Sequence, residues 1–246
     1  LQARHDYFHD LGCRISDHGL DTFYGEAYSL TEVNAIFEKA IQKSDLTTNE
    51  IQKYKSAILF DLAVMDFEKG WTQQFHVGAI RNNNSKMMKS TGPDTGFDSI
   101  GDMNHAESMS KFFDKLNYNN TLTKTIVYNL NPKDNEVFAA MAANFNEAPI
   151  KGKVQYGAAW WFLDQKDGIE KQLNALSNMG VVSNFIGMIT DSRSFLSFSR
   201  HDFFRRILCN LFGQEMENGL LPNDEVWIGE IIKDICYFNA KNYFNF

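Results

Sequence analysis

Cysteine is scarce in this chain of 246 residues. Its three cysteines, Cys13, Cys209 and Cys236, are far apart, and none belongs to a C-x-x-C pair. An odd and sparse set is typical of a reducing compartment and argues against a disulfide framework. The chain also shows no signal peptide at its start and no apolar run long enough to span a bilayer. Together these absences predict a soluble, cytoplasmic protein that does not use a membrane as a partner.

An excess of positive charge is missing as well. The formal net charge is −7 and the isoelectric point is about 5.4. A nucleic-acid-binding surface needs clustered Lys and Arg, so the sequence predicts no nucleic-acid partner. An acidic protein of this kind binds an anion only through a local cationic site. The remaining composition, 43% hydrophobic and 22% charged, is that of an ordinary globular protein with enough residues for a large core.

Several signatures of well-known enzyme classes are absent. No Gly-rich phosphate loop follows the first expected strand, which disfavours a dinucleotide-binding fold. The chain contains no G-x-S-x-G and no H-x-H. The segment "HDYFH" places His5 and His9 one helical turn apart, as in a zinc-protease signature, but Asp6 is a methylene shorter than the expected Glu and no third ligand follows. We therefore interpret both histidines as part of a solvated helix face.

Apolar, β-rich runs alternate with amphipathic stretches along the chain. The expected strands are 13–18, 71–80, 125–130, 153–159 and 183–190, and the expected helices are 31–43, 47–69, 104–117, 134–145, 165–179 and two more after residue 199. This alternation predicts an α/β fold with a parallel sheet. Polar residues repeatedly follow the strand ends, which favours a (β/α)8 TIM barrel because its active site lies at that edge. Only about five strands are found where such a barrel has eight.

Local signals set the limits of the longest expected helix. Thr47 and Glu50 form a capping-box pattern at its start, and Gly70 is a typical stop. Its expected apolar stripe is Ile51, Tyr54, Ile58, Leu62 and Met65. In the helices after residue 199, the side chains expected to face inward are Phe203, Phe204, Ile207, Leu208, Leu211, Val226, Ile231 and Ile235.

The stretch "MITDSRSFLS" carries the most suggestive charged pair. Asp191 ends the expected strand 183–190, and Arg193 lies on the same side of the chain if the backbone stays extended. One interpretation is structural: Asp191 caps a helix or pairs with Arg193. The other is functional: the carboxylate binds a metal or transfers a proton, beside a cation that holds an anionic substrate.

Other candidates follow the remaining strand ends. Strand periodicity places His76 on the polar side of "QQFHVGAI", facing the interior of the expected barrel, and Arg81 follows that strand. Trp160 and Trp161 in "AAWWFLDQ" are either core residues or a wall against a sugar. Asp17 and His18 end the first strand and are open to the same two interpretations. The long polar connection after residue 80 favours a functional loop because of its position after a strand.

Eight segments of the chain closely resemble the glucuronate (uronate) isomerases, in order and from end to end. They are "CRISDHGLD", "GWTQQFHVGAIRNNN", "GPDTGFDSI", "LNPKDNEV", "GAAWWFLDQKDG", "GMITDSRSFLS", "RHDFFRRILC" and "ICYFNAKNYF". The resemblance implies a branch of the amidohydrolase superfamily with a TIM barrel and a divalent metal, usually zinc. It also implies an aldose–ketose isomerisation in glucuronate catabolism, in which D-glucuronate is converted to D-fructuronate and D-galacturonate to D-tagaturonate.

The resemblance also assigns roles to individual residues. It implies that Asp191 is a catalytic residue and the metal ligand, that Arg193 acts in catalysis and substrate binding, and that His76, Arg81, Trp160 and Trp161 lie around the substrate pocket. Family members are much longer, so residues 1–246 are expected to be the C-terminal portion of a single TIM-barrel domain, roughly strands four to eight with the C-terminal helices, and to lack the N-terminal H-x-H metal pair.

This expected incompleteness has consequences for activity and partners. We expect the chain to be inactive alone and the metal to be absent from it, with a uronic acid as the substrate of the full-length enzyme. Two alternatives stay open: a metal-dependent hydrolase of the same superfamily, and a non-catalytic fragment. A homo-oligomer is among the expected partners, since open sheet edges promote self-association.

Overall fold

The computed structural model describes residues 1–245, and the chain forms two compact units. The first unit comprises Leu1–Val77 and Met103–Thr125. The second comprises Gly78–Asp102 and the residues from Ile126 onward. Strands alternate with helices in both, as the sequence predicts.

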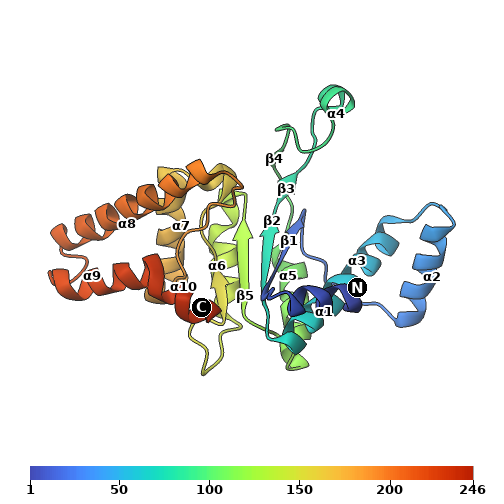
Figure 1. Cartoon of the computed structure of the whole chain (residues 1–246), viewed down its shortest axis with the longest axis horizontal. Coiled ribbons are helices and arrows are strands. Elements are labelled where there is room, and N and C mark those ends of the chain that lie inside the picture. The colour runs from blue at the N-terminus through green and yellow to red at the C-terminus, as the bar shows by residue number, and fades with distance from the viewer. Residues whose placement is uncertain (246) are drawn as a thin grey trace. The chain divides into compact units, whose positions relative to one another are not determined.

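Two parallel strands form the centre of the first unit (Figure 1). Gly19 on the first of these strands lies opposite His76 on the second. The elements of this unit, in chain order, are α1 (Gln2–Asp10), β1 (Ile15–Leu20), α2 (Leu30–Ile41), α3 (Thr48–Lys69), β2 (Thr72–Val77) and α5 (Ala106–Tyr118). The expected strands 13–18 and 71–80 and the expected helices are therefore confirmed to within a few residues.

Phenylalanine side chains make up much of the apolar core of the first unit. The ring of Phe23 lies 5.2 Å from that of Phe75, 5.8 Å from Phe112 and 5.5 Å from Phe113, centroid to centroid. All four are almost fully buried, and full burial of one such side chain stabilises a fold by roughly 1.5–3 kcal/mol. Because successive strand residues point to opposite faces, burial of Phe75 in this core turns His76 to the other face of β2.

The helix-end signals read from the sequence are confirmed. The Thr47 hydroxyl accepts the backbone N–H of Glu50, and the Glu50 carboxylate accepts the backbone N–H of Thr47. The structure adds a second capping box, of Ser29 and Glu32, at the start of α2, which was not predicted from the sequence. Gly70 ends α3 in the left-handed conformation, with φ of +68°, which only glycine adopts without strain.

The buried face of α3 differs from the expected stripe. Ile51 is 39% exposed, and the buried residues are Ser56, Ala57, Leu59, Ala63 and Asp66. The reason is that α3 is covered on more than one side. Tyr54 stacks on Phe37 of α2, with ring centroids 6.3 Å apart, while the small and polar residues allow close approach of the chain elsewhere. For example, Ser56 accepts the backbone N–H of Glu26.

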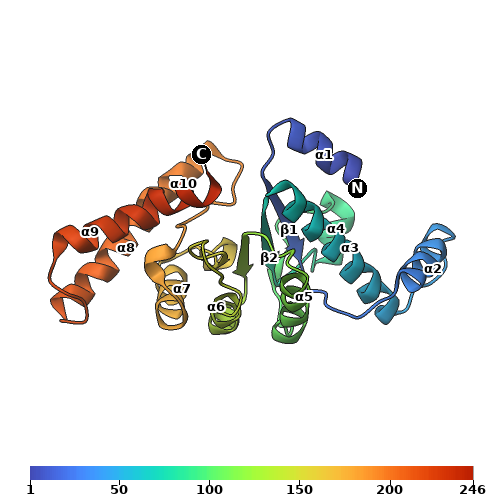
Figure 2. The ribbon, with the colours of Figure 1, turned by 90° about the horizontal axis from the view of Figure 1, so that it is seen from below.

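The second unit begins with a projecting arm and continues into alternating strands and helices (Figure 1). Its elements are β3 (Ala79–Ile80), α4 (Ser85–Thr91), β4 (Ser99–Ile100), β5 (Thr125–Asn129), α6 (Asn135–Ala143), β6 (Val154–Tyr156), α7 (Lys166–Met179), α8 (Ser199–Glu217), α9 (Glu225–Lys233), a π-helical turn (Asp234–Phe238) and α10 (Asn239–Phe244). The strands β5 and β6 are neighbours in the sheet. The helices α8 and α9 lie side by side (Figures 1 and 2).

The expected strand 183–190 is wrong. Residues Val182–Asn184 form a short 3-10 helix, and the described chain from Phe185 to Thr190 belongs to no strand. Two causes are visible. Gly187 has φ of +82°, outside the strand region, and the Asn239 side-chain amide donates to the carbonyls of Ser183 and Phe185. Phe185, Ile186 and Met188 are nevertheless buried, as expected for this run.

The other sequence expectations for the second unit are partly right. The strand at 125–130 is confirmed as β5, and the strand at 153–159 is shorter, as β6. Phe204, Ile207, Leu208 and Ile235 are buried, as expected. Phe203 and Val226 are exposed, so the prediction that they face inward is wrong. Among the described residues, no helix is long and apolar enough to cross a membrane.

Candidate functional site

His76, next to the last residue of β2, and Asp17, in the middle of β1, form a close pair in the first unit. Nδ1 of His76 lies 2.7 Å from Oδ1 of Asp17. The His76 side chain is 7% exposed, whereas that of Asp17 is 47% exposed, so the pair reaches from the interior to the surface. A carboxylate on Nδ1 favours the tautomer that carries its proton there and orients the ring. The sequence drew attention to His76, but not to Asp17 as its partner; the parallel pairing of β1 with β2 is what joins them.

His18, next to Asp17, behaves differently. Its ring stacks on Phe75, with centroids 5.6 Å apart. Burial lowers the pKa of His18, against the opposing effect of Asp66 and Asp17, which raise it. His18 is therefore held toward its neutral form, which fits a packed residue.

Arg81 lies on the projecting arm and is held by two carboxylates. It forms ion pairs with Asp94 and with Asp98, whose Oδ2 is 3.4 Å from Nη1. Its guanidinium carbon also lies 5.2 Å from the ring centroid of Trp161. Asp98 in turn accepts the backbone N–H of Asn82, so the arm is tied together at its base. The charge of Arg81 is thus engaged in ion pairs within the protein. Its expected role in substrate binding remains a prediction.

The two adjacent tryptophans have different environments. Trp160 is buried, and its indole N–H donates to the carbonyl of Asn129 over 2.9 Å. Trp161 is half-buried and has φ of +51°; its ring stacks on that of Phe162, and the Arg81 guanidinium lies over it. Their placement against a substrate remains a prediction.

Asp191 and Arg193 lie on an exposed loop before α8. Asp191 has φ of +45°, a left-handed conformation that Asp tolerates better than most residues. The chain is thus not extended here, and the argument that strand periodicity puts Asp191 and Arg193 on one side is wrong. Ser192 organises the loop, because its Oγ accepts from the backbone N–H of Ser194 and from the hydroxyl of Ser197.

A polar cluster after β5 was not selected from the sequence, although it lies in the segment "LNPKDNEV". Asn131 donates to the carbonyl of Gly101, and Lys133 pairs with Asp102. Burial raises the pKa of Asp134, and the Asp102 charge adds to this while Lys133 opposes it. These contacts connect the end of β5 to the end of the projecting arm within the second unit.

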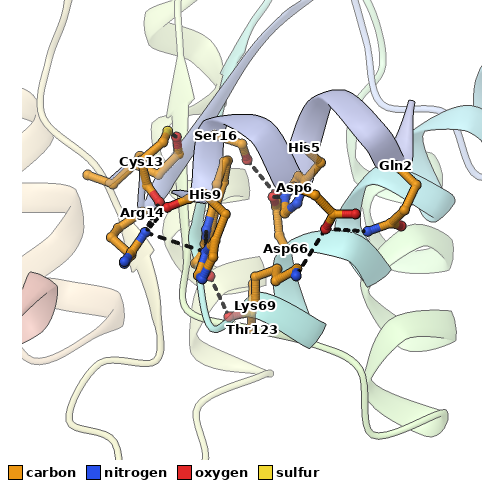
Figure 3. A network of polar contacts seen from close by, with 12 residues as sticks. Gln2, His5, Asp6, His9, Cys13, Arg14, Ser16, Asp66, Lys69 and Thr123 are labelled. Carbon is orange, nitrogen blue, oxygen red and sulfur yellow. Dashed lines mark hydrogen bonds and ion pairs between the residues drawn. The ribbon is translucent and has the colours of Figure 1, made fainter. Parts of the chain in front are cut away.

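The histidines of "HDYFH" do not lie on a solvated helix face, so that interpretation is wrong (Figure 3). Nε2 of His5 lies 3.0 Å from Oδ1 of the buried Asp66, whose other oxygen accepts from Ser16. The ring of His5 stacks on Trp71 at 4.0 Å, and the Trp71 indole N–H donates to Nδ1 of His9. The pattern therefore connects α1 to α3, β1 and the turn before β2.

Metal binding needs several ligands close together. Within residues 1–245, no group of three or more His, Cys, Asp or Glu side chains is arranged to hold a metal ion. A catalytic zinc site generally uses three protein ligands. The described part of the chain therefore does not provide a complete zinc site, and Asp191 is the only candidate ligand carried forward from the sequence.

The fold defines an α/β protein with parallel strands, and each unit carries polar and charged candidate residues near strand ends or on loops. The glucuronate isomerase family matches residues 1–244 of the chain. The chain belongs to the glucuronate isomerase family.

Individual relatives agree with this assignment. The chain is 59% identical to the uronate isomerase of Bacteroides thetaiotaomicron over 247 residues, which cover 100% of this chain and 53% of that protein. It is 54% identical to the uronate isomerase of Cellvibrio japonicus over 246 residues, covering 100% of this chain and 52% of that protein. The chain therefore spans about half the length of the curated relatives it matches.

Solved structures match the fold. The crystal structure of uronate isomerase from Thermotoga maritima has a TM-score of 0.90 at 32% identity, covering 99% of this chain and 52% of that one. Glucuronate isomerase from Caulobacter crescentus has a TM-score of 0.88 at 25% identity, covering 99% and 49%. The expected α/β fold with a parallel sheet is confirmed, and it matches half of a uronate isomerase barrel.

Proposed function

We propose that this chain forms part of a uronate isomerase, which interconverts D-glucuronate with D-fructuronate and D-galacturonate with D-tagaturonate in carbohydrate metabolism. The observation that carries the proposal is the match of residues 1–244 to one family, together with 59% identity to a uronate isomerase over the full length of this chain. The substrate is then a uronic acid, whose carboxylate explains why an acidic protein needs local cations.

The reaction moves a proton between two adjacent carbons through an enediol or enediolate, on which negative charge develops. Arg193 is the proposed partner of that charge or of the uronate carboxylate, because a guanidinium offers several N–H donors in one plane. The exposed position of Arg193 leaves it accessible to a ligand. Asp17 is proposed to orient His76, with the carboxylate on Nδ1 directing the basic lone pair of the ring to Nε2.

Asp191 is proposed as this chain's contribution to a divalent metal site, with zinc as the expected ion. One carboxylate does not make such a site, so the other ligands must come from outside the described residues. Cytoplasmic location and a homo-oligomer also remain predictions.

A chimera tests the proposal directly. In it, this chain replaces the matching 247 residues of the Bacteroides thetaiotaomicron relative. The chimera is assayed on glucuronate and galacturonate, and in parallel on amide and ester substrates. We expect isomerisation of the uronates and no hydrolysis, whereas hydrolysis without isomerisation would favour the metal-dependent hydrolase. The chain alone, supplied with zinc and glucuronate, is expected to show no turnover.

Two substitutions in the chimera test the assigned residues. Asp191→Asn and Arg193→Lys are each expected to lower kcat by at least about 100-fold. A neutral amide is a weaker metal ligand than a carboxylate, and a lysine point charge does not replace a planar, bidentate guanidinium. Matched controls are Asp45→Asn and Arg4→Lys, which lie on exposed positions and should leave turnover unchanged. Near-normal turnover of Asp191→Asn or Arg193→Lys would refute the role of that residue.

A further inference from the structure

Arg200 joins two loops of the second unit that carry candidate residues. It is the second residue of α8, and its Nη1 donates to the backbone carbonyl of Thr190 over 2.8 Å. Its Nη2 forms an ion pair with Asp164. Thr190 directly precedes Asp191, and Asp164 directly follows the short helix that contains Trp161.

Asp164 is a firm anchor for this arrangement. Its side chain is 1% exposed, against 32% for that of Arg200. A buried carboxylate is costly unless it is paired, so Asp164 favours a conformation in which the guanidinium stays in place. The backbone N–H of Asp164 also donates to the carbonyl of Trp161, which ties the anchor to its own loop.

The segment before Asp191 depends on such side-chain contacts. The described residues Phe185–Thr190 form no strand ladder, so their backbone is not positioned by strand pairing. Asn239 holds the early part, through the carbonyls of Ser183 and Phe185. Arg200 holds the last carbonyl before the candidate site.

That last peptide determines where the Asp191 side chain points. The angle φ of Asp191, +45°, is a rotation relative to the plane of the Thr190–Asp191 peptide. Because Arg200 fixes the oxygen of this peptide, it fixes the reference from which both Asp191 and the following residues extend. Catalytic groups tolerate little displacement: a shift of about 1 Å costs on the order of 100-fold in rate.

We propose that Arg200, held by Asp164, is a positioning residue that orients Asp191 and Arg193. The inference rests on the proposed isomerase function for its kinetic consequence, but the anchoring itself is a property of this chain. Arginine is required because two nitrogens of one planar group serve two partners at once, whereas a lysine offers a single nitrogen.

The test uses two conservative substitutions, Arg200→Lys and Asp164→Asn, with Arg206→Lys as the matched control. Arg206 lies on the same helix and pairs with Asp202, but its side chain is 78% exposed. In the chimera, Arg200→Lys and Asp164→Asn should each lower kcat by about 30- to 100-fold while KM changes less than about 3-fold. Arg206→Lys should change neither constant.

Hydrogen exchange on the 246-residue chain supplies a readout that does not depend on activity. Arg200→Lys should raise the exchange rates of amides in residues 190–197 by at least about tenfold and leave those of α6 and α7 unchanged. Unchanged exchange in residues 190–197 for both variants, or unchanged kcat with the fold intact, would overturn the proposal. General loss of protection in α6 and α7 would also overturn it, because the pair would then act on the whole unit. A chimera that is inactive before any substitution would instead refute the proposed function, while the exchange experiment would still decide whether Arg200 anchors the loop.

Discussion

The strand β2 and the segment Phe185–Thr190 are both largely buried, were both predicted as strands from the sequence, and end beside candidate site residues, yet they are held in different ways. β2 lies in a parallel ladder with β1, and this pairing brings Asp17 to His76. The segment Phe185–Thr190 has a left-handed glycine in its middle and takes its contacts from the side chains of C-terminal helices. Both stretches are buried, but only β2, whose backbone hydrogen-bonds to a neighbouring strand, is itself a strand.

The strongest test of this contrast is Gly187→Ala. The new Cβ would lie 2.4 Å from the carbonyl oxygen of Ile235, in a residue whose φ of +82° already disfavours a side chain. We expect the free energy of unfolding to fall by about 3–5 kcal/mol, measured by urea denaturation of the chain.

Gly213→Ala is the matched control. Gly213 lies within α8, and a Cβ there would meet no atom within 4 Å. It should raise the free energy of unfolding by about 0.5–1 kcal/mol, because alanine favours a helix over glycine. Equal effects of the two substitutions would mean that Gly187 is not constrained as the structure shows.

In the first unit, the substitution with the largest expected effect is at Asp66, which connects α3 with β1 and α1 (Figure 3). Asp66→Asn keeps the size of the side chain but removes the negative charge that faces His5. We expect a loss of about 2 kcal/mol in the free energy of unfolding, since hydrogen bonds to a charged group are stronger than neutral ones.

Asp6→Asn is the control for that substitution. Asp6 lies on α1 and pairs with Lys69 at the surface, where solvent screens the interaction. No measurable change in unfolding is expected. A result for Asp66→Asn as small as that for Asp6→Asn would show that burial of the His5–Asp66 pair does not contribute to stability.

A smaller effect is expected when the side-chain support of Phe185–Thr190 is removed by Asn239→Ala. The variant loses two hydrogen bonds to backbone carbonyls, for an expected cost of about 1–2 kcal/mol. Asn242→Ala on the exposed side of α10 is the control and should be neutral. If the two variants unfold alike, the segment is held by apolar burial alone.

The smallest effect concerns pH and the first unit. Burial lowers the pKa of His18 in the folded chain below its ordinary value of 6.5. The unfolded chain then binds a proton more readily, so the contribution of His18 to stability is present above pH 6.5 and is lost as the pH falls below it. Urea denaturation between pH 5 and 8 (about the range in which histidine titrates) should show this slope, and His18→Gln should reduce it. A slope that His18→Gln leaves unchanged would assign it to other groups.

Much of the fold was predictable because its signals are local. The capping boxes at Ser29 and Thr47 and the stop at Gly70 involve groups within a turn or two of one another. The strands β1, β2 and β5 were predicted from short runs of residue types that favour strands. The candidate site was less predictable: His76 was found from strand periodicity, but its pairing with Asp17 depends on which strands lie together.

The failures have a common physical origin. The exposed Ile51 and the buried Asp66 on α3, and the buried His5 on α1, follow from which elements cover each helix. The expected strand 183–190 was wrong: Gly187 turns the chain, and the side chains of Asn239 and Arg200 bind backbone carbonyls of this region. In these cases, contacts between residues far apart in sequence outweigh the local preference.

The sequence by itself determined where most helices begin and end, the alternation of helices with strands, and membership of the glucuronate isomerase family. The limits of the helices and strands depend on backbone preferences and capping hydrogen bonds, which act over short stretches of chain. Family membership follows from the identity of the residues along the chain. Only the tertiary structure decided that Phe185–Thr190 is no strand, that Asp17 meets His76, and that Arg200 joins Asp164 to Thr190. A strand ladder, a buried ion pair and an anchored loop each need a distant partner, and the partner's position is settled only when the chain packs.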